Sequence, residues 1–348
     1  MRVFKDHLII NGSSVKQALE LLNKLAPDSI LFVVDHDDKL IGSLTDGDVR
    51  RGLLNDFTVA SRIDEIIQPN PRFIRKGEND IQKIITYREE LFRILPVVDE
   101  NMRVVNVINF RTIKSYLPID AVIMAGGRGQ RLQPFTDTTP KPLLKVGDKP
   151  IMEHNIDRLA SYGIDDFWVS VKYLGEQIEQ YFGDGHQKNI KIEYVWETEP
   201  LGTIGAVSKI TNFDHDFVLV TNSDLLATID YEDFFLDFIR QEADFAVLTI
   251  PYKVSIPYAV LETKDGIINS LIEKPIYTYY SNGGVYLMKK KMLQHIPKNS
   301  FFNSTDLMES LVNKNYKVIS YPFSGYWLDV GKHEDFKKAQ IDIQNLKF

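Results

Sequence analysis

A glycine-rich segment with two basic residues gives the strongest chemical signal in the 348-residue sequence. The run AGGRGQR (125–131) follows an apolar stretch typical of a buried strand, and Pro-Lys-Pro follows at 140–142. Glycines let backbone N–H groups approach phosphate oxygens, and Arg131 and Lys141 supply positive charge beside them. The run has neither the Gly-Lys-Ser/Thr ending of a P-loop nor the third glycine of a dinucleotide fingerprint. We interpret it as another kind of polyphosphate-binding loop; the alternative is a basic surface turn.

Two aspartates are candidate metal ligands. Asp224 ends the apolar run 218–224, and Asp329 lies between apolar neighbours in 327–331. A carboxylate just beyond a buried strand faces the ligand crevice of an α/β sheet, and Mg²⁺ prefers one or two carboxylates together with substrate phosphates. The structural alternatives are an Asx-turn or helix cap for Asp224 and a lysine or backbone N–H partner for Asp329.

Further polar groups surround these aspartates in the sequence. Glu197 precedes a second glycine loop that contains Gly202 and Thr203, and its carboxylate could accept the N1–H and 2-amino group of guanine; the alternative is charge complementarity at a helix N-terminus. Glu273 and Lys274 could bind the hydroxyls and phosphate of a sugar phosphate, or form a surface ion pair. The run NGGVY (282–286) completes the set with Asn282 and Gly284.

Alternating strands and helices must position these residues. Apolar runs predict strands at 121–125, 166–171, 190–196, 217–220 and 245–250. Helical patterns lie between them at 152–162, 174–181, 203–209 and 233–241. This order predicts a mostly parallel α/β sheet with helices on both faces.

The first third of the chain contains an internal repeat. Helix, strand, strand and helix are predicted at 15–25, 30–34, 40–44 and from Thr45, and again at 79–90, 95–98, 104–108 and 110–116. Residues 1–117 hold 17 basic and 17 acidic residues, so the net charge of −7 resides in the remainder. We therefore expect two repeats, at about 1–63 and 64–116, followed by a larger domain over 119–348.

The composition excludes several classes of protein. The chain has 41 Lys and Arg against 48 Asp and Glu, a balance unsuited to nucleic-acid binding. It has no cysteine, which excludes disulfides, zinc–thiolate sites and cysteine nucleophiles. No stretch approaches the ~20 apolar residues of a membrane span, and the first residues lack the apolar core of a signal peptide. A cytoplasmic location is expected.

The ordered motifs resemble those of sugar-1-phosphate nucleotidyltransferases over about residues 119–348. Gln130 departs from the threonine usual in that family, which affects the fine contacts of the loop. The resemblance implies a GT-A-like, Rossmann-like sheet on which a sugar-1-phosphate oxygen attacks the α-phosphorus of a nucleoside triphosphate. It implies Mg²⁺ or Mn²⁺ at Asp224 and Asp329, and catalytic roles for Arg131, Lys141 and Lys274. It further implies nucleotide binding by Ala125, Gly126, Gly127, Gly129, Glu197, Gly202 and Thr203, and sugar binding by Glu273, Asn282 and Gly284.

The N-terminal repeat resembles a CBS pair, or Bateman module. In the run LIGSLTDGDVR (40–50), Thr45 and Asp48 match the ribose-binding positions of a CBS domain; the alternative is a helix capping box. The second copy carries Asn109 and Thr112 at the matching places, so we expect at most one good purine-nucleotide site. The resemblance implies homo-oligomerisation through the CBS domains and either nucleotide regulation or a purely structural module.

This domain order resembles the guanylyltransferases of bacterial legionaminic-acid synthesis, which make GDP-glucosamine from glucosamine-1-phosphate and GTP. The segment ETEPLGT (197–203) is also similar to mannose-1-phosphate guanylyltransferases. We therefore expect GTP as the nucleotide and glucosamine-1-phosphate as the sugar substrate. Alternatives are a mannose- or heptose-1-phosphate guanylyltransferase and a uridylyl- or thymidylyltransferase. A nucleotide sensor without turnover is a hypothesis of a different class.

Overall fold

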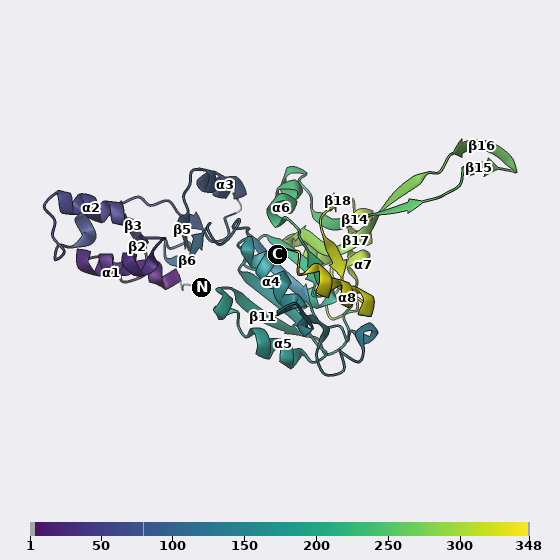
Figure 1. Cartoon of the computed structure of the whole chain (residues 1–348), viewed down its shortest axis with the longest axis horizontal. Coiled ribbons are helices and arrows are strands. Elements are labelled where there is room, and N and C mark those ends of the chain that lie inside the picture. Colours follow the sequence, from purple (N-terminus) through teal and green to yellow (C-terminus); the bar gives the residue numbers. More distant parts are fainter. Residues whose placement is uncertain (1–3, 79, 347–348) are drawn as a thin grey trace.

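The computed structural model describes residues 4–78 and 80–346 (Figure 1). A small N-terminal part lies against a larger part, and a two-stranded arm projects from the larger part on the side away from the N-terminus. Among the described residues, no helix is both long enough and apolar enough to cross a membrane.

The first N-terminal unit is a three-stranded sheet with two helices. Its elements are β1 (Leu8–Ile10), α1 (Val15–Leu25), β2 (Ile30–Val34), β3 (Leu40–Thr45) and α2 (Asp46–Leu54). The sheet order is β1-β2-β3, with β1 parallel and β3 antiparallel to β2. The apolar face of α1 packs with the strands in a core of this unit's own. The sequence predicted both helices and both strands of the hairpin.

The second unit repeats the same sheet. It contains β4 (Ile74–Arg75), α3 (Ile81–Glu89), β5 (Ile94–Val98) and β6 (Val104–Asn109), in the order β4-β5-β6. Each hairpin has a register irregularity at the same place, between Val33 and Val34 and between Val97 and Val98. The internal repeat is therefore present in the backbone.

The predicted helix at 110–116 is wrong. After Asn109 the chain makes one turn, in which the N–H groups of Thr112 and Ile113 donate to the Asn109 carbonyl. The following N–H groups donate to the larger part: Lys114 to the Ser161 carbonyl at 2.6 Å. These contacts replace the hydrogen bonds that a helix would have made.

The second unit shares its core with the larger part. Buried Ile84, Leu95 and Ile108 belong to the same apolar cluster as Ile119 and Phe167 of the large sheet. Bidentate hydrogen bonds from Arg88 to Glu232, at 2.8 and 2.9 Å, join the two parts. The second unit is therefore anchored on the larger part, while the first unit extends beyond it (Figure 1).

A seven-stranded mixed sheet forms the larger part. Its order is β11-β10-β7-β12-β17-β14-β18. The strands are β7 (Ile119–Met124), β10 (Asp166–Val171), β11 (Lys191–Trp196), β12 (Phe217–Asn222), β14 (Phe245–Ser255), β17 (Ile276–Lys289) and β18 (Val318–Pro322). The first four are mutually parallel, and β17 is antiparallel to both of its neighbours. The mostly parallel α/β sheet is confirmed.

Alternate residues of the central strands enter two cores. Ala121 and Ile123 of β7 belong to one apolar cluster, and Val122 belongs to another. Because successive strand side chains point to opposite faces, both faces of the sheet are covered. The covering helices are α4 (Ile151–Ser161), α5 (Gly175–Phe182), α6 (Tyr231–Arg240) and α7 (Ser304–Asn313), whereas α8 (His333–Asp342) packs in a smaller core beside the sheet. The predicted helix at 203–209 is a short 3₁₀ helix, η6 (Gly205–Lys209).

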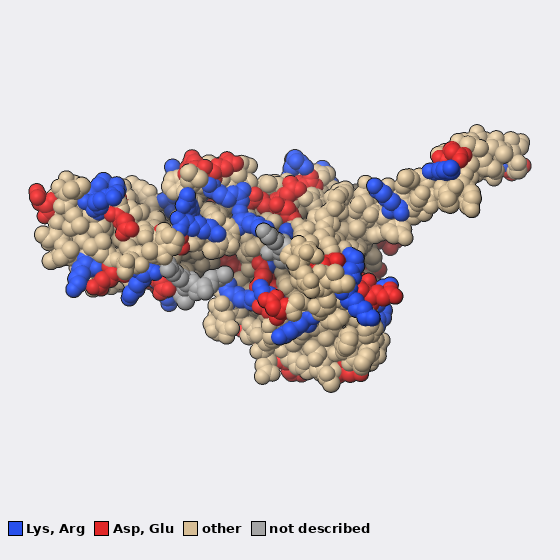
Figure 2. Space-filling view, viewed as in Figure 1, with Lys and Arg blue, Asp and Glu red and all other residues tan. Residues whose placement is uncertain are grey.

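Strands β14 and β17 continue past the sheet into the arm. The pairing runs from Thr249 and Asn282 to Ser255 and Ile276, and β15 (Val260–Lys264) and β16 (Ile267–Ile272) form the tip. The arm carries few charges on the face shown in Figure 2. Many of its apolar side chains are exposed, such as Ile267 at 68% and Ile276 at 65%.

Short elements complete the chain. They are η1 (Phe4–His7), η2 (Ile63–Glu65), η3 (Gln130–Leu132), η4 (Lys141–Leu143), β8 (Lys145–Val146), β9 (Lys149–Pro150), η5 (His186–Lys188), β13 (Leu225–Ala227), η7 (Lys290–His295) and β19 (Trp327–Asp329).

Candidate active site

The carboxyl ends of four parallel strands meet at one edge of the large sheet. The glycine loop follows β7, Glu197 follows β11, and Asp224 comes two residues after β12. Strand β13, directly after Asp224, pairs antiparallel with β19, so that Leu225 lies opposite Asp329. The Val330 N–H donates to the Asp224 carbonyl at 3.0 Å. The fold therefore brings the two predicted metal ligands together from distant parts of the sequence.

Lys141 lies between the two carboxylates. Its Nζ makes a close ion pair with Asp224 Oδ2 and is 4.0 Å from Asp329 Oδ1. The lysine side chain is only 11% exposed. Burial and the Asp224 charge raise the pKa of Asp329, and Lys141 and Arg131 offset this effect in part. A carboxylate pair of this kind needs positive charge, which Lys141 supplies here.

The Arg131 guanidinium is near the same carboxylates. A Cβ placed on Gly331 would lie 3.4 Å from Arg131 Nη2 and 3.5 Å from Asp329 Oδ1. Arg131 is exposed and belongs to η3, which begins directly after the left-handed Gly129. The structure thus places Lys141 between the two aspartates and Arg131 near Asp329.

Two glycines of the loop have different surroundings. A Cβ on Gly126 would lie 2.7 Å from Glu197 Oε1, whereas a Cβ on Gly127 would meet nothing within 4 Å. A side chain at position 126 would therefore collide with Glu197 beneath the loop, whereas the backbone at Gly127 has no neighbouring atoms on the side of a Cβ. Ala125, which precedes them, is buried at 1% exposure.

Glu197 is buried and hydrogen-bonded inside the protein. Ser170 Oγ donates to Oε1 in a short contact, and the Leu201 N–H donates to Oε2 at 3.1 Å. These contacts position the carboxylate beneath the glycine loop. An ionised carboxylate has about four acceptor positions, so each oxygen retains one for a ligand. The sequence did not indicate Ser170, because a serine inside an apolar strand carries no distinctive signal.

A hydrogen-bond network links the predicted nucleotide and sugar residues. Ser304 N–H donates to Thr203 Oγ1 at 2.9 Å, and Ser304 Oγ donates to the Tyr286 hydroxyl at 2.7 Å. The Tyr286 hydroxyl in turn hydrogen-bonds with the Asn282 side chain. Ser304 was missed at the sequence level, although it is the first residue of α7, whose capping box centres on Asn303.

Gly202 and Gly284 allow close approaches of the backbone. Gly202 has φ +79°, and a Cβ there would lie 2.5 Å from the Phe302 carbonyl oxygen. Gly284 has φ +74°, and a Cβ would lie 2.7 Å from Asn222 Nδ2. A Cβ at Gly284 would also lie 3.2 Å from Leu225 Cδ1, so Gly284 lies beside the segment that carries Asp224.

Glu273 and Lys274 are not at this site in the structure. Both are exposed and lie in the arm, in the short connection between β16 and β17. Six residues of extended strand separate Asn282 from Ile276, which corresponds to about 20 Å. The arm projects away from the sheet (Figure 1). Their predicted roles at the sugar phosphate therefore stay predictions.

Thr45 and Asp48 form the capping box of α2. Asp48 Oδ2 accepts from the Thr45 N–H at 2.9 Å, and Asp48 Oδ1 accepts from Arg51 and Gln68. Burial raises the pKa of Asp48, but the hydrogen bonds from Thr45, Gln68 and Arg51 lower it overall. The helix capping box, the alternative to ribose binding, is thus present in the structure. Ribose binding by Thr45 and Asp48 stays a prediction.

A cavity of about 680 Å³ lies where both N-terminal units meet the larger part, and Phe4, His7 and Asp28 line it from the first unit. It is lined by Asn109 and Thr112, the second-copy counterparts of Thr45 and Asp48, and by Asp157 and Ser161 of α4. The N-terminal half of α4 faces the active site, where Asn155 Nδ2 donates to the Ser223 carbonyl. One helix therefore connects this cavity to the residue before Asp224.

Comparison with known proteins identifies the larger part and the first N-terminal unit. Residues 120–345 match the Nucleotidyl transferase family. The chain belongs to this family. Residues 11–55 match the CBS domain family, so this nucleotidyl transferase carries an N-terminal CBS domain.

Similar proteins share the region of the large sheet. The D-glycero-alpha-D-manno-heptose 1-phosphate guanylyltransferase of Aneurinibacillus thermoaerophilus is 32% identical over 65% of this chain and 99% of its own length. The mannose-1-phosphate guanylyltransferase of Mycobacterium tuberculosis is 30% identical over 65% of this chain and 64% of its own. HddC from Yersinia pseudotuberculosis, solved in complex with GMP-PN, has a TM-score of 0.50 and 26% identity, covering 64% of this chain and 99% of that protein.

Proposed function

We propose that this nucleotidyl transferase moves GMP from GTP to a sugar-1-phosphate and releases pyrophosphate. The observation that carries the proposal is the grouping of Asp224, Asp329, Lys141 and Arg131 beside a glycine loop at the carboxyl edge of the sheet. This edge is where ligands bind in open α/β sheets.

The reaction needs positioning and charge neutralisation more than covalent chemistry from the protein. An oxygen of the sugar-1-phosphate attacks the α-phosphorus, and the bond to pyrophosphate breaks in line with the attack. Arg131 neutralises the departing pyrophosphate, and Lys141 neutralises the phosphates near the reacting centre. Gly126 allows the loop backbone that faces the triphosphate to lie close to Glu197.

Asp224 and Asp329 are suited to hold a divalent cation. Their Oδ1 atoms are buried and have no hydrogen-bond partner among the described residues. Two carboxylate oxygens without hydrogen-bond partners, close together and beside a phosphate-binding loop, favour a bound cation. When bound, Mg²⁺ or Mn²⁺ supplies charge stabilisation to the phosphates.

The choice of GTP rests on Glu197 and on the similar proteins. Ser170 and Leu201 fix the Glu197 carboxylate below the loop while leaving acceptor positions for two guanine donors. Two of the similar proteins bear the name guanylyltransferase. A uridylyl- or thymidylyltransferase is the alternative. Assays with four different nucleoside triphosphates distinguish it from a guanylyltransferase.

For the sugar, we propose glucosamine-1-phosphate and a product used in bacterial surface-glycan or legionaminic-acid synthesis. The support is the resemblance of the CBS-plus-transferase order to that group of enzymes. Mannose- or heptose-1-phosphate is the alternative, supported by the names of the similar proteins. Asn282 and Gly284 border the site on the sugar side, and Glu273 and Lys274 would reach it through a movement of the arm.

We further propose that residues 1–116 form two CBS domains, at about 1–63 and 64–116, ahead of a catalytic domain over 119–348. The repeated strand order and hairpin irregularity support this division. A purine nucleotide would regulate the enzyme through this module, which would also form homo-oligomers. A purely structural role for the module is the alternative.

The test is product analysis on the full chain with Mg²⁺, four nucleoside triphosphates and glucosamine-, mannose- and heptose-1-phosphates. The proposal predicts GDP-glucosamine by mass spectrometry, formed from GTP alone. A different nucleotide-sugar would correct the base or the sugar. Nucleotide binding without any product from the folded chain would support the sensor hypothesis.

A further inference from the structure

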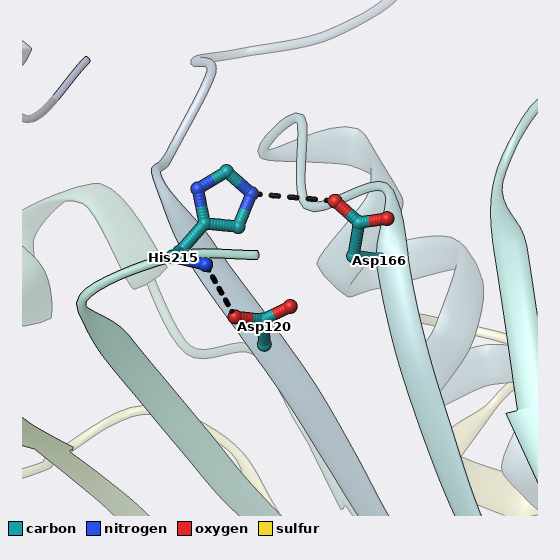
Figure 3. A group of neighbouring side chains, drawn as sticks. All are labelled: Asp120, Asp166 and His215. Atoms are coloured by element: carbon teal, nitrogen blue, oxygen red, sulfur yellow. Dashed lines mark hydrogen bonds and ion pairs between the residues drawn. The ribbon is translucent and has the colours of Figure 1, made fainter. Parts of the chain in front are cut away.

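A buried cluster of three side chains lies at the end of the sheet opposite the candidate active site. Asp120 and Asp166 are near the amino ends of β7 and β10, and His215 lies two residues before β12 (Figure 3). Asp120 and Asp166 are direct neighbours across the parallel pair. Their exposures are 1% and 5%, and that of His215 is 3%. The proposed reaction uses none of the three.

The cluster brings one imidazole and two carboxylates into a small volume. His215 Nε2 is 3.3 Å from Asp166 Oδ2. The His215 and Asp214 N–H groups donate to the two oxygens of Asp120, at 2.8 and 3.2 Å. One nitrogen or oxygen from each of the three side chains lies within 4.8 Å of the other two. Backbone hydrogen bonds thus fix Asp120, and each of its oxygens keeps a lone pair directed elsewhere.

Several of these atoms lack hydrogen bonds. Asp166 Oδ2 and both ring nitrogens of His215 are buried without a hydrogen-bond partner in the part of the chain that the structure describes. Figure 3 shows Nε2 and Oδ2 pointing toward each other. Nε2 and Oδ2 form an ion pair at 3.3 Å, so they satisfy each other only in part. Unsatisfied polar atoms inside proteins are rare and costly, and a cation bound by both atoms would satisfy them more fully.

The cluster also carries more negative than positive charge. Asp165 and Asp214 adjoin it. The positive groups are protonated His215, Lys191, and Lys76 of the second N-terminal unit, which is 3.5 Å from Asp166 Oδ2 and 3.1 Å from Asp214 Oδ2. Two adjacent carboxylates in a sheet repel each other. Burial raises the pKa of Asp120 to about 6, although hydrogen bonds from His215 and Asp214 oppose this. A divalent cation would balance the excess.

We propose that Asp120, Asp166 and His215 bind one divalent transition-metal ion of the zinc class. Imidazole with carboxylates favours Zn²⁺, Co²⁺ or Mn²⁺, whereas Mg²⁺ prefers oxygen ligands alone. Ligation requires neutral His215 and displaces the proton that its Nε2 directs toward Asp166 Oδ2. Ligand bonds of about 2.0–2.2 Å require the three side chains to move closer together. The cation would take the place of Lys76 at Asp166, since both are held by the same oxygen.

The test is titration of the chelator-treated full chain with Co²⁺ in excess Mg²⁺, followed by visible absorption and calorimetry. The proposal predicts one Co²⁺ per chain with absorption typical of nitrogen and oxygen ligands. His215→Gln should weaken binding at least ~10-fold, whereas Asp224→Asn should leave it unchanged. Absence of binding by the folded wild-type chain, or equal binding by a folded His215→Gln variant, contradicts the proposal.

Lys76→Gln provides a second test that does not disturb a buried group. The Lys76 side chain is 38% exposed, so this variant should fold. Removal of a competing cation should tighten Co²⁺ binding ~3-fold or more, since such pairs contribute up to about 1 kcal/mol. Unchanged or weaker Co²⁺ binding by Lys76→Gln counts against a site at Asp166.

Discussion

The ammonium group of Lys141 contacts the carboxylate of Asp224 and is 4.0 Å from that of Asp329. Lys141 comes from the segment after the glycine loop, whereas the two aspartates come from β12's carboxyl end and from β19. One lysine therefore connects the proposed triphosphate loop to the proposed cation ligands. This geometry explains why a nucleotide and a cation would bind next to each other.

Replacement of Lys141 should abolish most activity without unfolding the protein. Lys141→Gln removes the charge beside the reacting phosphates, so we expect kcat to fall at least ~100-fold. Pyrophosphate release measures the effect. The matched control is Lys191→Gln, whose exposed lysine pairs with Glu193 at the opposite end of the sheet. Equal losses in both variants would argue against a specific role.

The two loop glycines should respond differently to alanine. In Gly126→Ala the new Cβ would lie 2.7 Å from Glu197 Oε1, whereas in Gly127→Ala it would meet nothing within 4 Å. We expect the KM for the nucleotide to rise ~10- to 100-fold in the first variant and to change little in the second. Steady-state kinetics compare them. Similar KM values in both variants would show that the loop does not hold the nucleotide as proposed.

Glu197 should determine the choice of base. Glu197→Gln keeps an acceptor for Ser170 or Leu201 but cannot accept both guanine donors, so selectivity for GTP over UTP should fall ~10- to 100-fold. The ratio of kcat/KM for the two nucleotides measures this. Glu199→Gln, at an exposed position two residues later, is the control. Unaltered selectivity in Glu197→Gln would mean that another group recognises the base.

Asp48 should stabilise the first N-terminal unit in a pH-dependent way. Burial raises the pKa of Asp48, but hydrogen bonds from Thr45, Gln68 and Arg51 lower it overall. The stabilisation is therefore complete above the unfolded pKa of 3.8 and is lost as pH falls through the lower folded value. Asp48→Asn should lower the Tm at pH 7, and the difference from wild type should shrink below pH 4. Thermal unfolding of Asp48→Asn and of the exposed-site control Asp46→Asn tests this; a constant difference would refute it.

The sequence predicted the parallel sheet, because apolar strands can be recognised from short stretches of sequence. It also predicted the grouping of Asp224 with the glycine loop, because both follow parallel strands whose carboxyl ends meet at one edge of the sheet. The end of the helical pattern after Asn109 was not predictable, since the N–H groups of Lys114 and Leu117 donate to the carbonyls of Ser161 and Tyr162, which are distant in sequence. The position of Lys274 also escaped prediction. The sequence motif around Lys274 shows which residue types are present but not where they lie. Their position depends on how far β14 and β17 stay paired beyond the sheet, which sets the length of the arm. The hydrogen bond from Ser170 to Glu197 was not predictable either, because it forms only when β10 and β11 lie side by side.

The most direct measurement is pyrophosphate release from GTP and glucosamine-1-phosphate with Mg²⁺, for wild type and Asp224→Asn. The account predicts turnover by the wild type and a rate at least ~1000-fold lower for the variant, which loses a cation ligand and the partner of Lys141. Equal rates in the two proteins would contradict the role of Asp224. No release by the folded wild type with any nucleotide and sugar-1-phosphate would contradict the proposed reaction itself.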